Sequence, residues 1–365
     1  MASERPKKKL GKKILTGAGI ILGVIVLAVG WLLGWLTLSE FRPEPVETLA
    51  VEGAPSAVLT PGRELTVMTW NVGYGALGDN ADFFMDGGTG VRTADETRVR
   101  ENLAAVTDVL RERMPDVVFL QEVDRDSDRS HHIDEAAEIT AAMPGYANTF
   151  AYNYRVLFVP YPVPPIGKVN SGLLTLSGYP VSASRRIQLP CPFSWPMRLG
   201  NLKRCLMVDR VPLENSDREL VLVNLHLEAY DDGEGKIAQT EMLRQLLETE
   251  AAAGNYVIAG GDFNQIFSTV ENPWPAQEGM WRPGEIDVSA FQAGWQFAMD
   301  GTTPSCRSLD KPYAGADRET FQYYLIDGFL LSEGLSVESL ETLDLGFAAS
   351  DHNPVLLAVR LPQEG

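Results

Sequence analysis

The chain has 365 residues, of which 45% are hydrophobic and 22% charged, which is enough for one large domain or two small ones. Its formal net charge is −18, and residues 1–42 contain seven Lys or Arg and only two acidic residues, so residues 43–365 carry about −23. Such a charge favours solubility and disfavours long duplex nucleic acid as a partner, although a local basic patch could exist. Three cysteines cannot all pair internally; free or buried thiols are favoured over a Cys191–Cys205 bridge, and Cys306 would stay unpaired.

An uncharged stretch from Ile14 to Ser39 is long enough to cross a bilayer, for which a helix needs about 20 residues. Five lysines precede it, which predicts a cytoplasmic N-terminus, and Trp31 and Trp35 lie near its far end, where aromatic side chains prefer the membrane interface. The alternative is a cleaved signal peptide, but the stretch is longer than the usual apolar core and no small-residue cleavage pattern follows closely. We therefore predict the following organisation: a basic cytoplasmic tail (1–13), a single transmembrane helix (14–39), a linker acting as a tether (40–63) and an extracytoplasmic domain (64–362).

Alternating strand and helix patterns in the outer domain predict an α/β fold with two packed sheets. Between residues 94 and 113 the apolar residues recur at helical spacing, as they do again between 235 and 253. Three long segments, 78–93, 160–170 and 265–312, are expected to be loops at a functional rim, although the last could equally be a packed lid without substrate contact. The other expected elements are a helix at 135–143 and strands at 65–70, 117–120, 172–176, 206–211, 220–225, 257–259, 324–331 and 355–359.

Polar side chains follow five of the predicted strands, at the ends where α/β folds place their chemistry. One such ending would be an ordinary cap or turn, but five together indicate a site for a phosphate ester and a hard cation. Carboxylates bind Mg²⁺, amides and protonated imidazoles donate to phosphoryl oxygens, and Asp or His can accept a proton from an attacking water. The five endings are Asn71, Glu122, His226, Asp262 with Asn264, and Asp351 with His352.

Short motifs in a fixed order resemble those of the endonuclease/exonuclease/phosphatase superfamily, from about residue 64 to 361. The resemblance implies an α/β four-layer α/β/β/α sandwich with the active site at one end of two central sheets. The motifs are Thr69-Trp70-Asn71, Leu120-Gln121-Glu122, Asn224-Leu225-His226, Gly261-Asp262-Phe263-Asn264, Ile326-Asp327-Gly328 and Ser350-Asp351-His352.

The resemblance implies a metal site and a phosphate site. Glu122 resembles the principal Mg²⁺ ligand, with Asp351 near the metal. Asn71 and Asn264 resemble residues that hold the metal network and the scissile phosphate. Mg²⁺ is the expected cofactor, and Mn²⁺ is an expected substitute.

Four further residues resemble the catalytic set of this superfamily. Asp262 resembles the carboxylate that positions or activates water, and His352 resembles the histidine at the scissile phosphate, oriented by Asp327. His226 resembles the second catalytic histidine of pancreatic-type deoxyribonuclease and bacterial sphingomyelinases. Many abasic-site endonucleases instead carry an acid where this chain has Gly73, which argues against a repair nuclease.

Three functions are compatible with these residues. A membrane-anchored phosphodiesterase acting outside the cytoplasm on a lipid head group or small phosphodiester is favoured by the anchor, the acidic charge and the sphingomyelinase-like stretch 226–231. An extracytoplasmic nuclease would use the same residues. A non-catalytic binding module is disfavoured because the expected catalytic residues are intact. An inositol phosphatase would need a cationic pocket, for which Lys168, Lys203 and Arg204 are the candidates.

Overall fold

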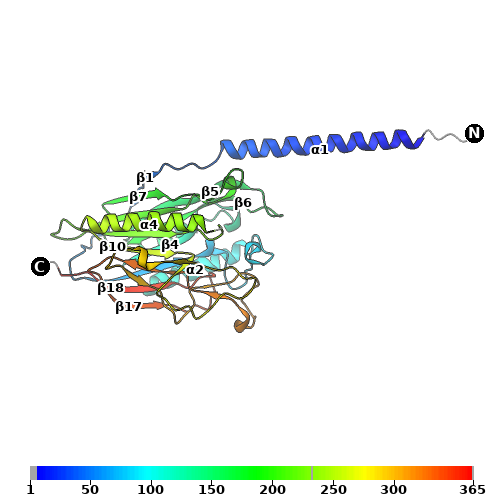
Figure 1. Cartoon of the computed structure of the whole chain (residues 1–365). Coiled ribbons are helices and arrows are strands. Elements are labelled where there is room, and N and C mark those ends of the chain that lie inside the picture. The colour runs from blue at the N-terminus through cyan, green and yellow to red at the C-terminus, as the bar shows by residue number, and fades with distance from the viewer. Residues whose placement is uncertain (1–5, 232, 364–365) are drawn as a thin grey trace, which may run out of the picture.

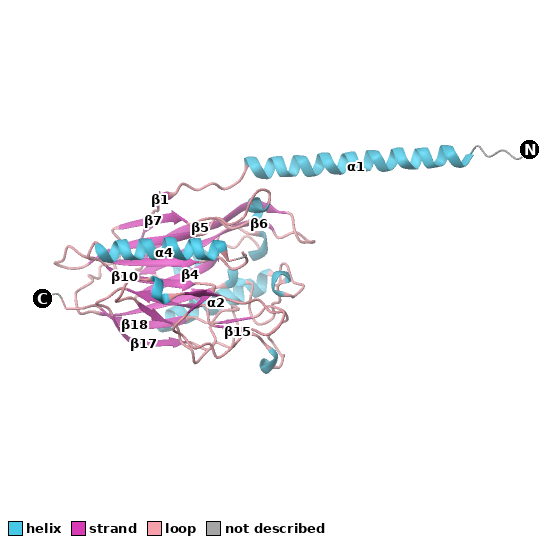
Figure 2. Cartoon of the chain, in the orientation of Figure 1, coloured by secondary structure: helices cyan, strands magenta, loops and turns pink. Residues whose placement is uncertain are grey.

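Two seven-stranded sheets pack face to face between layers of helices in this computed structural model, which describes residues 6–363 apart from residue 232 (Figures 1 and 2). The first sheet has the order β1 (Val46–Thr48), β7 (Ala183–Gln188), β8 (Cys205–Pro212), β9 (Glu219–His226), β10 (Tyr256–Asp262), β16 (Asp327–Leu331) and β13 (Gln296–Ala298). The second sheet has the order β17 (Ser336–Thr342), β18 (Val355–Arg360), β3 (Glu64–Asn71), β4 (Val117–Asp124), β6 (Gly167–Ser177), β5 (Ala147–Val159) and β2 (Val51–Glu52).

The helices form the outer layers and confirm the predicted four-layer α/β/β/α sandwich. Helix α2 (Glu96–Arg113) begins at Asp95, whose side chain accepts from the Arg98 N–H and so caps the helix. Its buried apolar side chains share one cluster with α3 (Glu135–Ala142) and the outer face of the second sheet. Helix α4 (Glu234–Ala252) covers the first sheet through Leu243 and Leu247.

The interior between the sheets is apolar, but it also contains a polar bridge. Leu65, Phe119 and Phe329 belong to the apolar cluster that joins the two sheets. Nearer the site, the Gln121 amide donates to Asn224 Oδ1 at 2.9 Å, and the Asn224 amide donates back to the Leu120 carbonyl at 3.2 Å. Because buried polar groups are costly unless paired, this bridge fixes how the two sheets meet.

Two parallel strand pairs determine where the site lies. Strand β3 pairs parallel with β4, and β9 pairs parallel with β10, each through a crossover helix. Parallel neighbours end at the same edge, so the polar ends of both pairs meet at one end of the sandwich. The small pairs β11 (Gln265–Phe267) with β12 (Gly284–Ile286), and β14 (Cys306–Arg307) with β15 (Tyr323–Tyr324), lie within or border the long segment expected to be a loop.

The N-terminal part differs from the sequence-based expectation in one respect. Helix α1 (Pro6–Leu38) contains an apolar segment, Lys13–Leu38, that is long enough to cross a membrane by length and composition. The residues after it, expected to form a tether, instead add a strand to each sheet: β1 pairs with β7, and β2 with β5. The edge strands of both sheets have unpaired backbone groups that can recruit a short segment with little sequence pattern of its own.

Candidate active site

The predicted site residues come together at one end of the two sheets. In the first sheet, Asp262 ends β10 and lies opposite His226 on one side and Asp327 on the other. The second sheet contributes Asn71 and Glu122, the latter from a β-bulge in β4 between Leu120 and Val123. Glu122 has a φ of 56°, a conformation that a non-glycine residue rarely adopts unless its surroundings enforce it.

Asp262 is the centre of the site. It is buried, and Oδ2 accepts from the Asn71 amide at 3.1 Å and lies 3.4 Å from His226 Nε2 and 3.8 Å from His352 Nε2. Its other oxygen accepts from the Asn264 N–H at 2.9 Å. Burial, together with the nearby Asp327 charge, raises the pKa of Asp262 to about 7, although His352 acts in the opposite direction.

Asp327 orients and charges His352. Its Oδ2 lies 2.8 Å from His352 Nδ1, with both side chains buried. The Ser305 hydroxyl accepts from the backbone N–H groups of Ile326 and Asp327 and holds this carboxylate in place. Burial opposes a charge on His352, but the Asp327 carboxylate outweighs it, so the pKa of His352 lies well above its usual value.

His226 has the opposite electrostatic environment. Burial and the neighbouring Arg204 guanidinium hold the pKa of His226 well below its usual value. Arg204 Nη1 donates to the His226 carbonyl at 3.2 Å, and Arg204 also forms an ion pair with Glu228. His226 Nδ1 has no partner among the described residues. The two histidines on either side of Asp262 therefore differ in charge at neutral pH.

The metal site expected from the sequence is a pair of carboxylates beside this centre. Glu122 accepts from the Asn71 amide at 3.1 Å, so Asn71 links the two groups of acids. Burial raises the pKa of Asp351 to about 6, and the Glu122 charge adds to this effect. Among the described residues neither acid forms an ion pair with a Lys or Arg, and the Glu122 charge acts on Asp351, so both are candidate oxygen ligands for a hard cation.

Two groups of possible metal ligands also lie around His352, and one of them includes the soft sulfur ligand of a cysteine. The ligand atoms of Cys306, Asp351 and His352 lie within 4.8 Å of one another, as do those of Asp262, Asp327 and His352. Burial raises the pKa of the Cys306 thiol to about 12, and only the thiolate is a good ligand. The set of Asp262, Asp327 and His352 is the hydrogen-bonded group already described. Glu122 and Asp351 stay the pair of metal ligands expected from the sequence.

The three candidate phosphate-binding cations are all engaged elsewhere. Lys168 pairs with Asp126, Lys203 lies 3.4 Å from the Glu40 carboxylate, and Arg204 pairs with Glu228. Asn264 donates its amide to the Leu227 carbonyl at 2.9 Å, which leaves its side chain directed at the loop after β9. These contacts do not provide a spare cationic pocket for a terminal phosphate.

Sequence reasoning missed the groups that support the site. Among these, Gln121 and Asn224 bridge the sheets, Arg204 and Glu228 flank His226, and Ser305 holds the Asp327 backbone. Gln121 and Asn224 each belong to one of the quoted motifs, but their role in joining the two sheets was not predicted; the signal for it is a polar residue inside an otherwise apolar strand.

Two segments close over the mouth of the site. The Tyr230 hydroxyl, from the loop after β9, donates to Asp86 Oδ1 at 3.1 Å, and Asp86 ends the short helix η2 (Phe84–Asp86). Trp281 donates to the Ala229 carbonyl at 3.0 Å. The segments 78–93 and 265–312 thus both contact the loop after β9.

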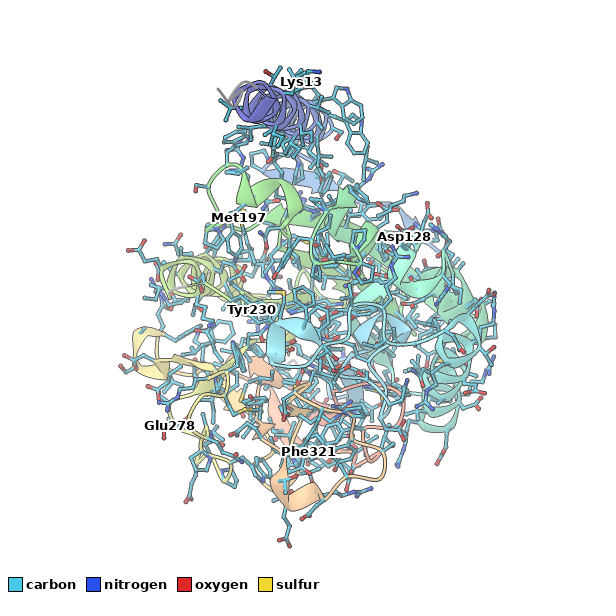
Figure 3. All side chains as sticks on the ribbon, turned by 90° about the vertical axis from the view of Figure 1, so that its right-hand side faces the viewer. Lys13, Asp128, Met197, Tyr230, Glu278 and Phe321 are labelled. Atoms are coloured by element: carbon cyan, nitrogen blue, oxygen red, sulfur yellow. The ribbon has the colours of Figure 1, made fainter. Side chains whose placement is uncertain are left out.

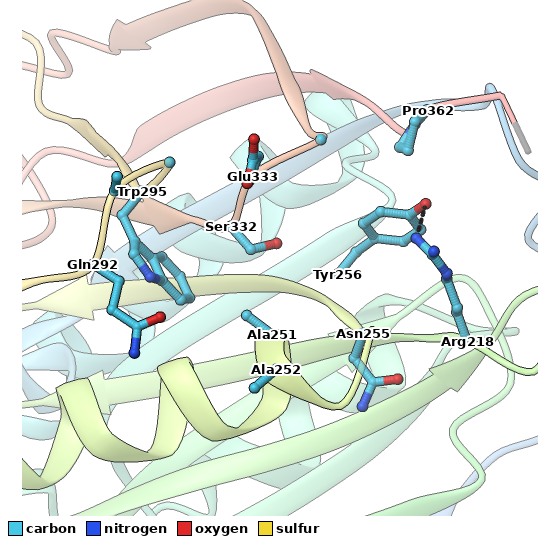
Figure 4. Close-up of a pocket in the computed structure, with 14 residues that line it drawn as sticks. Arg218, Ala251, Ala252, Asn255, Tyr256, Gln292, Trp295, Ser332, Glu333 and Pro362 are labelled. Carbon is cyan, nitrogen blue, oxygen red and sulfur yellow. Dashed lines mark hydrogen bonds between the residues drawn. The ribbon is translucent and has the colours of Figure 1, made fainter.

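One hollow of the surface lies away from this site. A cavity of about 490 Å³ is lined by Arg218, Tyr256 and Trp295, among others (Figure 4). Tyr256 begins β10 and Asp262 ends it, so this cavity lies at the opposite end of the first sheet. It contains none of the paired acids and histidines.

These features define a metal-dependent phosphoester hydrolase. The family model described as Endonuclease/Exonuclease/phosphatase family matches residues 68–352, and the chain belongs to this family. No curated protein matches the chain.

Solved structures share the fold at low sequence identity. An endonuclease/exonuclease/phosphatase from Beutenbergia cavernae is 19% identical over 82% of this chain and 72% of that one, with a TM-score of 0.55. One from Bacteroides vulgatus is 16% identical over 82% and 99%, with a TM-score of 0.53. ANGEL2, a 2′,3′-cyclic phosphatase, is 14% identical over 86% and 98%, with a TM-score of 0.52.

Proposed function

We propose that this protein is a membrane-anchored Mg²⁺-dependent phosphodiesterase that acts outside the cytoplasm on a lipid head group or a small phosphodiester. The observation that carries the proposal is the arrangement of a neutral and a protonated histidine on either side of Asp262, next to the acids Glu122 and Asp351. A diester needs both a proton acceptor for water and a donor for the leaving oxygen, and this arrangement contains both.

In the proposed mechanism, water attacks the phosphorus in line with the leaving oxygen. Asp262, whose pKa is raised to about 7, accepts one proton of the water, and the neutral His226 lies beside it, with Nε2 3.4 Å from Asp262 Oδ2. His352, held charged by Asp327, donates to the phosphoryl or leaving oxygen, where negative charge develops. The Asn71 amide holds the Glu122 and Asp262 carboxylates in place, and Asn264 would bind the phosphate only by releasing its amide from the Leu227 carbonyl. When Mg²⁺ or Mn²⁺ is bound at Glu122 and Asp351, with Asn71 nearby, it neutralises charge on the phosphoryl oxygens.

The sequence reasoning left the roles of the two histidines open, and their surroundings favour one assignment. The lowered pKa of His226 keeps it neutral but makes it a weak base, so Asp262, with a pKa of about 7, is the better proton acceptor. His352 is held charged by the Asp327 carboxylate and therefore carries the proton that can be donated.

The contacts of the N-terminal helix favour an anchor over a cleaved signal sequence. Leu36 is buried, and Trp195 Nε1 donates to Thr37 Oγ1 at 3.1 Å. The Glu40 side chain is only 4% exposed and forms ion pairs with Arg198 and Lys203. Cleavage at the end of the apolar helix would remove or expose these groups. The five lysines before the helix favour a cytoplasmic N-terminus.

Charge favours a lipid or small phosphodiester over nucleic acid. Residues 43–365 carry about −23, which repels a polyanion, and the basic side chains near the site are already paired. An extracytoplasmic nuclease is the second candidate, because a nuclease would use the same acids and histidines.

Turnover by the full-length chain in phospholipid vesicles, with and without Mg²⁺, tests the proposal. The substrates are choline phospholipids, bis(p-nitrophenyl) phosphate, and single- and double-stranded DNA. We expect turnover of the lipid or the small diester that is lost on chelation and in His352→Ala. Asp209→Asn is the control, because it changes a buried carboxyl outside the site. Turnover of DNA alone would favour the nuclease, and no turnover of any of these substrates would contradict the proposal.

A further inference from the structure

The C-terminal end of α1 is fixed to the catalytic domain at the level of the active site. Strand β1 begins at Val46, which pairs with Ile187 in β7. The cross-strand partners continue from Ile187 to Leu206 in β8, Leu225 in β9 and Gly261 in β10, which precedes Asp262. The start of β1 is therefore at the same end of the first sheet as the catalytic residues. Figure 1 shows α1 leaving the domain and extending beyond this end.

The junction between helix and domain is packed. Glu40, 4% exposed, lies 3.1 Å from Arg198 and 3.4 Å from Lys203, and the Arg155 and Arg186 guanidinium groups lie 5.8 and 5.7 Å from the Phe41 ring centre. The Glu40 side chain is therefore enclosed by basic groups of the domain, although Arg198 itself is 42% exposed. The domain is thus oriented relative to the helix.

Two loops beside this junction have large apolar side chains in solvent. The tip of the β5–β6 hairpin contains Tyr161 and Val163, which are 68% and 94% exposed. The loop between β7 and β8 contains Trp195 and Met197, which are 50% and 65% exposed. Such exposure of neighbouring apolar groups indicates a contact surface.

Both loops project past the end of the sheets on the side of the site. Strand β4 pairs with β6 only as far as Asp124, whereas the β5–β6 pairing continues to Val159 and Gly167. The hairpin tip packs on the site rim through Phe84 and Tyr161, whose ring centres are 5.7 Å apart. In the view from this end, Met197 and Tyr230 lie on the face from which α1 projects, with Lys13 on the helix (Figure 3).

We propose that Tyr161, Val163, Trp195 and Met197 form a docking rim that inserts into the surface of the same bilayer that α1 crosses, with the active-site mouth facing the head groups. The inference rests on the proposed function, because it takes α1 as a membrane anchor. An apolar helix of 26 residues spans about 39 Å at 1.5 Å per residue, enough for the hydrocarbon core. Since α1 ends beside the two loops, the membrane surface must lie close to them.

A lipid surface suits the chemistry of the docking rim better than a protein partner does. Trp and Tyr are the residues that prefer the membrane interface, where their rings lie among the acyl chains and their polar atoms remain near water. Trp195 lies beside the end of the anchor, since its Nε1 donates to Thr37 Oγ1 at 3.1 Å. A substrate that is itself a lipid would then reach Asp262 and the two histidines without leaving the membrane.

Depth-dependent quenching in the full-length protein tests the docking rim. Val163→Cys and Met197→Cys, each in a Cys191→Ser background, are labelled with an environment-sensitive fluorophore and reconstituted in phosphatidylcholine vesicles. Cys205 and Cys306 are buried and should not label. Val58→Cys is the matched control: it is 58% exposed and precedes Leu59, which bridges to Leu213 at the far end of the first sheet.

We expect doxyl-labelled lipid to reduce the emission at positions 163 and 197 by about twofold or more, as for groups within the outer acyl region, with little change at 58. Equal quenching at all three positions, or none at 163 and 197, would overturn the proposal. The readout requires no turnover. A protein quenched at the rim but inactive on every phosphodiester would therefore contradict the proposed hydrolysis alone, and an active protein without quenching would contradict the docking rim alone.

Discussion

Asp327→Asn tests whether the charge of Asp327, and not only its shape, is needed beside His352. The substitution keeps the size of the side chain next to His352 but removes the carboxylate that holds the imidazole charged and oriented at 2.8 Å. Both groups are buried, so water cannot replace the lost interaction. Loss of one partner from a buried charged hydrogen bond costs about 2–5 kcal/mol. If about 3 kcal/mol of this is expressed in the transition state, kcat falls roughly 10²-fold.

The assay is turnover of bis(p-nitrophenyl) phosphate by full-length protein at saturating Mg²⁺. The control is Asp209→Asn, which changes an equally buried carboxyl that accepts from Thr149 between the sheets, away from the histidines. We expect kcat to fall with little change in KM in Asp327→Asn and to stay near the wild-type value in the control. If Asp327→Asn retained activity within about threefold, or if both variants lost activity equally, the assigned role of Asp327 would be refuted.

Three further predictions concern the metal, the backbone and stability. Glu122→Gln should raise the Mg²⁺ concentration needed for half-maximal activity by about 10-fold or more, because a charged oxygen donor is lost. An unchanged Mg²⁺ dependence would show that Glu122 is not a metal ligand. Gly261→Ala should prevent stable folding, since its Cβ would lie 1.9 Å from the Leu225 carbonyl oxygen; a soluble variant with normal thermal unfolding would contradict the strand packing described here. Burial raises the pKa of Asp209 from 3.8 to about 6, so the folded state binds this proton more tightly than the unfolded state does. The free energy of unfolding that this proton contributes is fully present below pH 3.8 and is lost as the pH rises through about 6. Asp209→Asn should therefore be more stable than wild type by about 3 kcal/mol at pH 8 and nearly equal at pH 4, as measured by urea unfolding; parallel pH dependences of the two proteins would show that the carboxyl is ionised without penalty.

Local patterns in the sequence were sufficient for the elements nearest the site. The strands that contain Asn71, Glu122, His226 and Asp262 at or near their ends are short apolar runs followed by polar residues, and such runs are visible without knowledge of their neighbours. The helices at 96–113 and 234–252 have apolar spacing that requires only one buried face. The apolar segment near the N-terminus is recognisable from composition alone.

Other features depended on contacts between distant segments. Strands β5 and β1 were not predicted, because β5 mixes polar and apolar residues along 13 positions and β1 has only three residues that gain partners from a sheet edge. The opposite charge states of His226 and His352 follow from burial, Arg204 and Asp327, which are far apart in sequence.

The sequence by itself determined the family and the presence of an apolar N-terminal segment, and it predicted a set of candidate catalytic side chains, because each is a local pattern of residue types. Only the tertiary structure decided which histidine is charged, which cations are already paired, and that the active site and the end of α1 lie at the same end of the sheets. Those properties arise from burial and from charges a few ångströms apart, and chain folding alone brings such groups together.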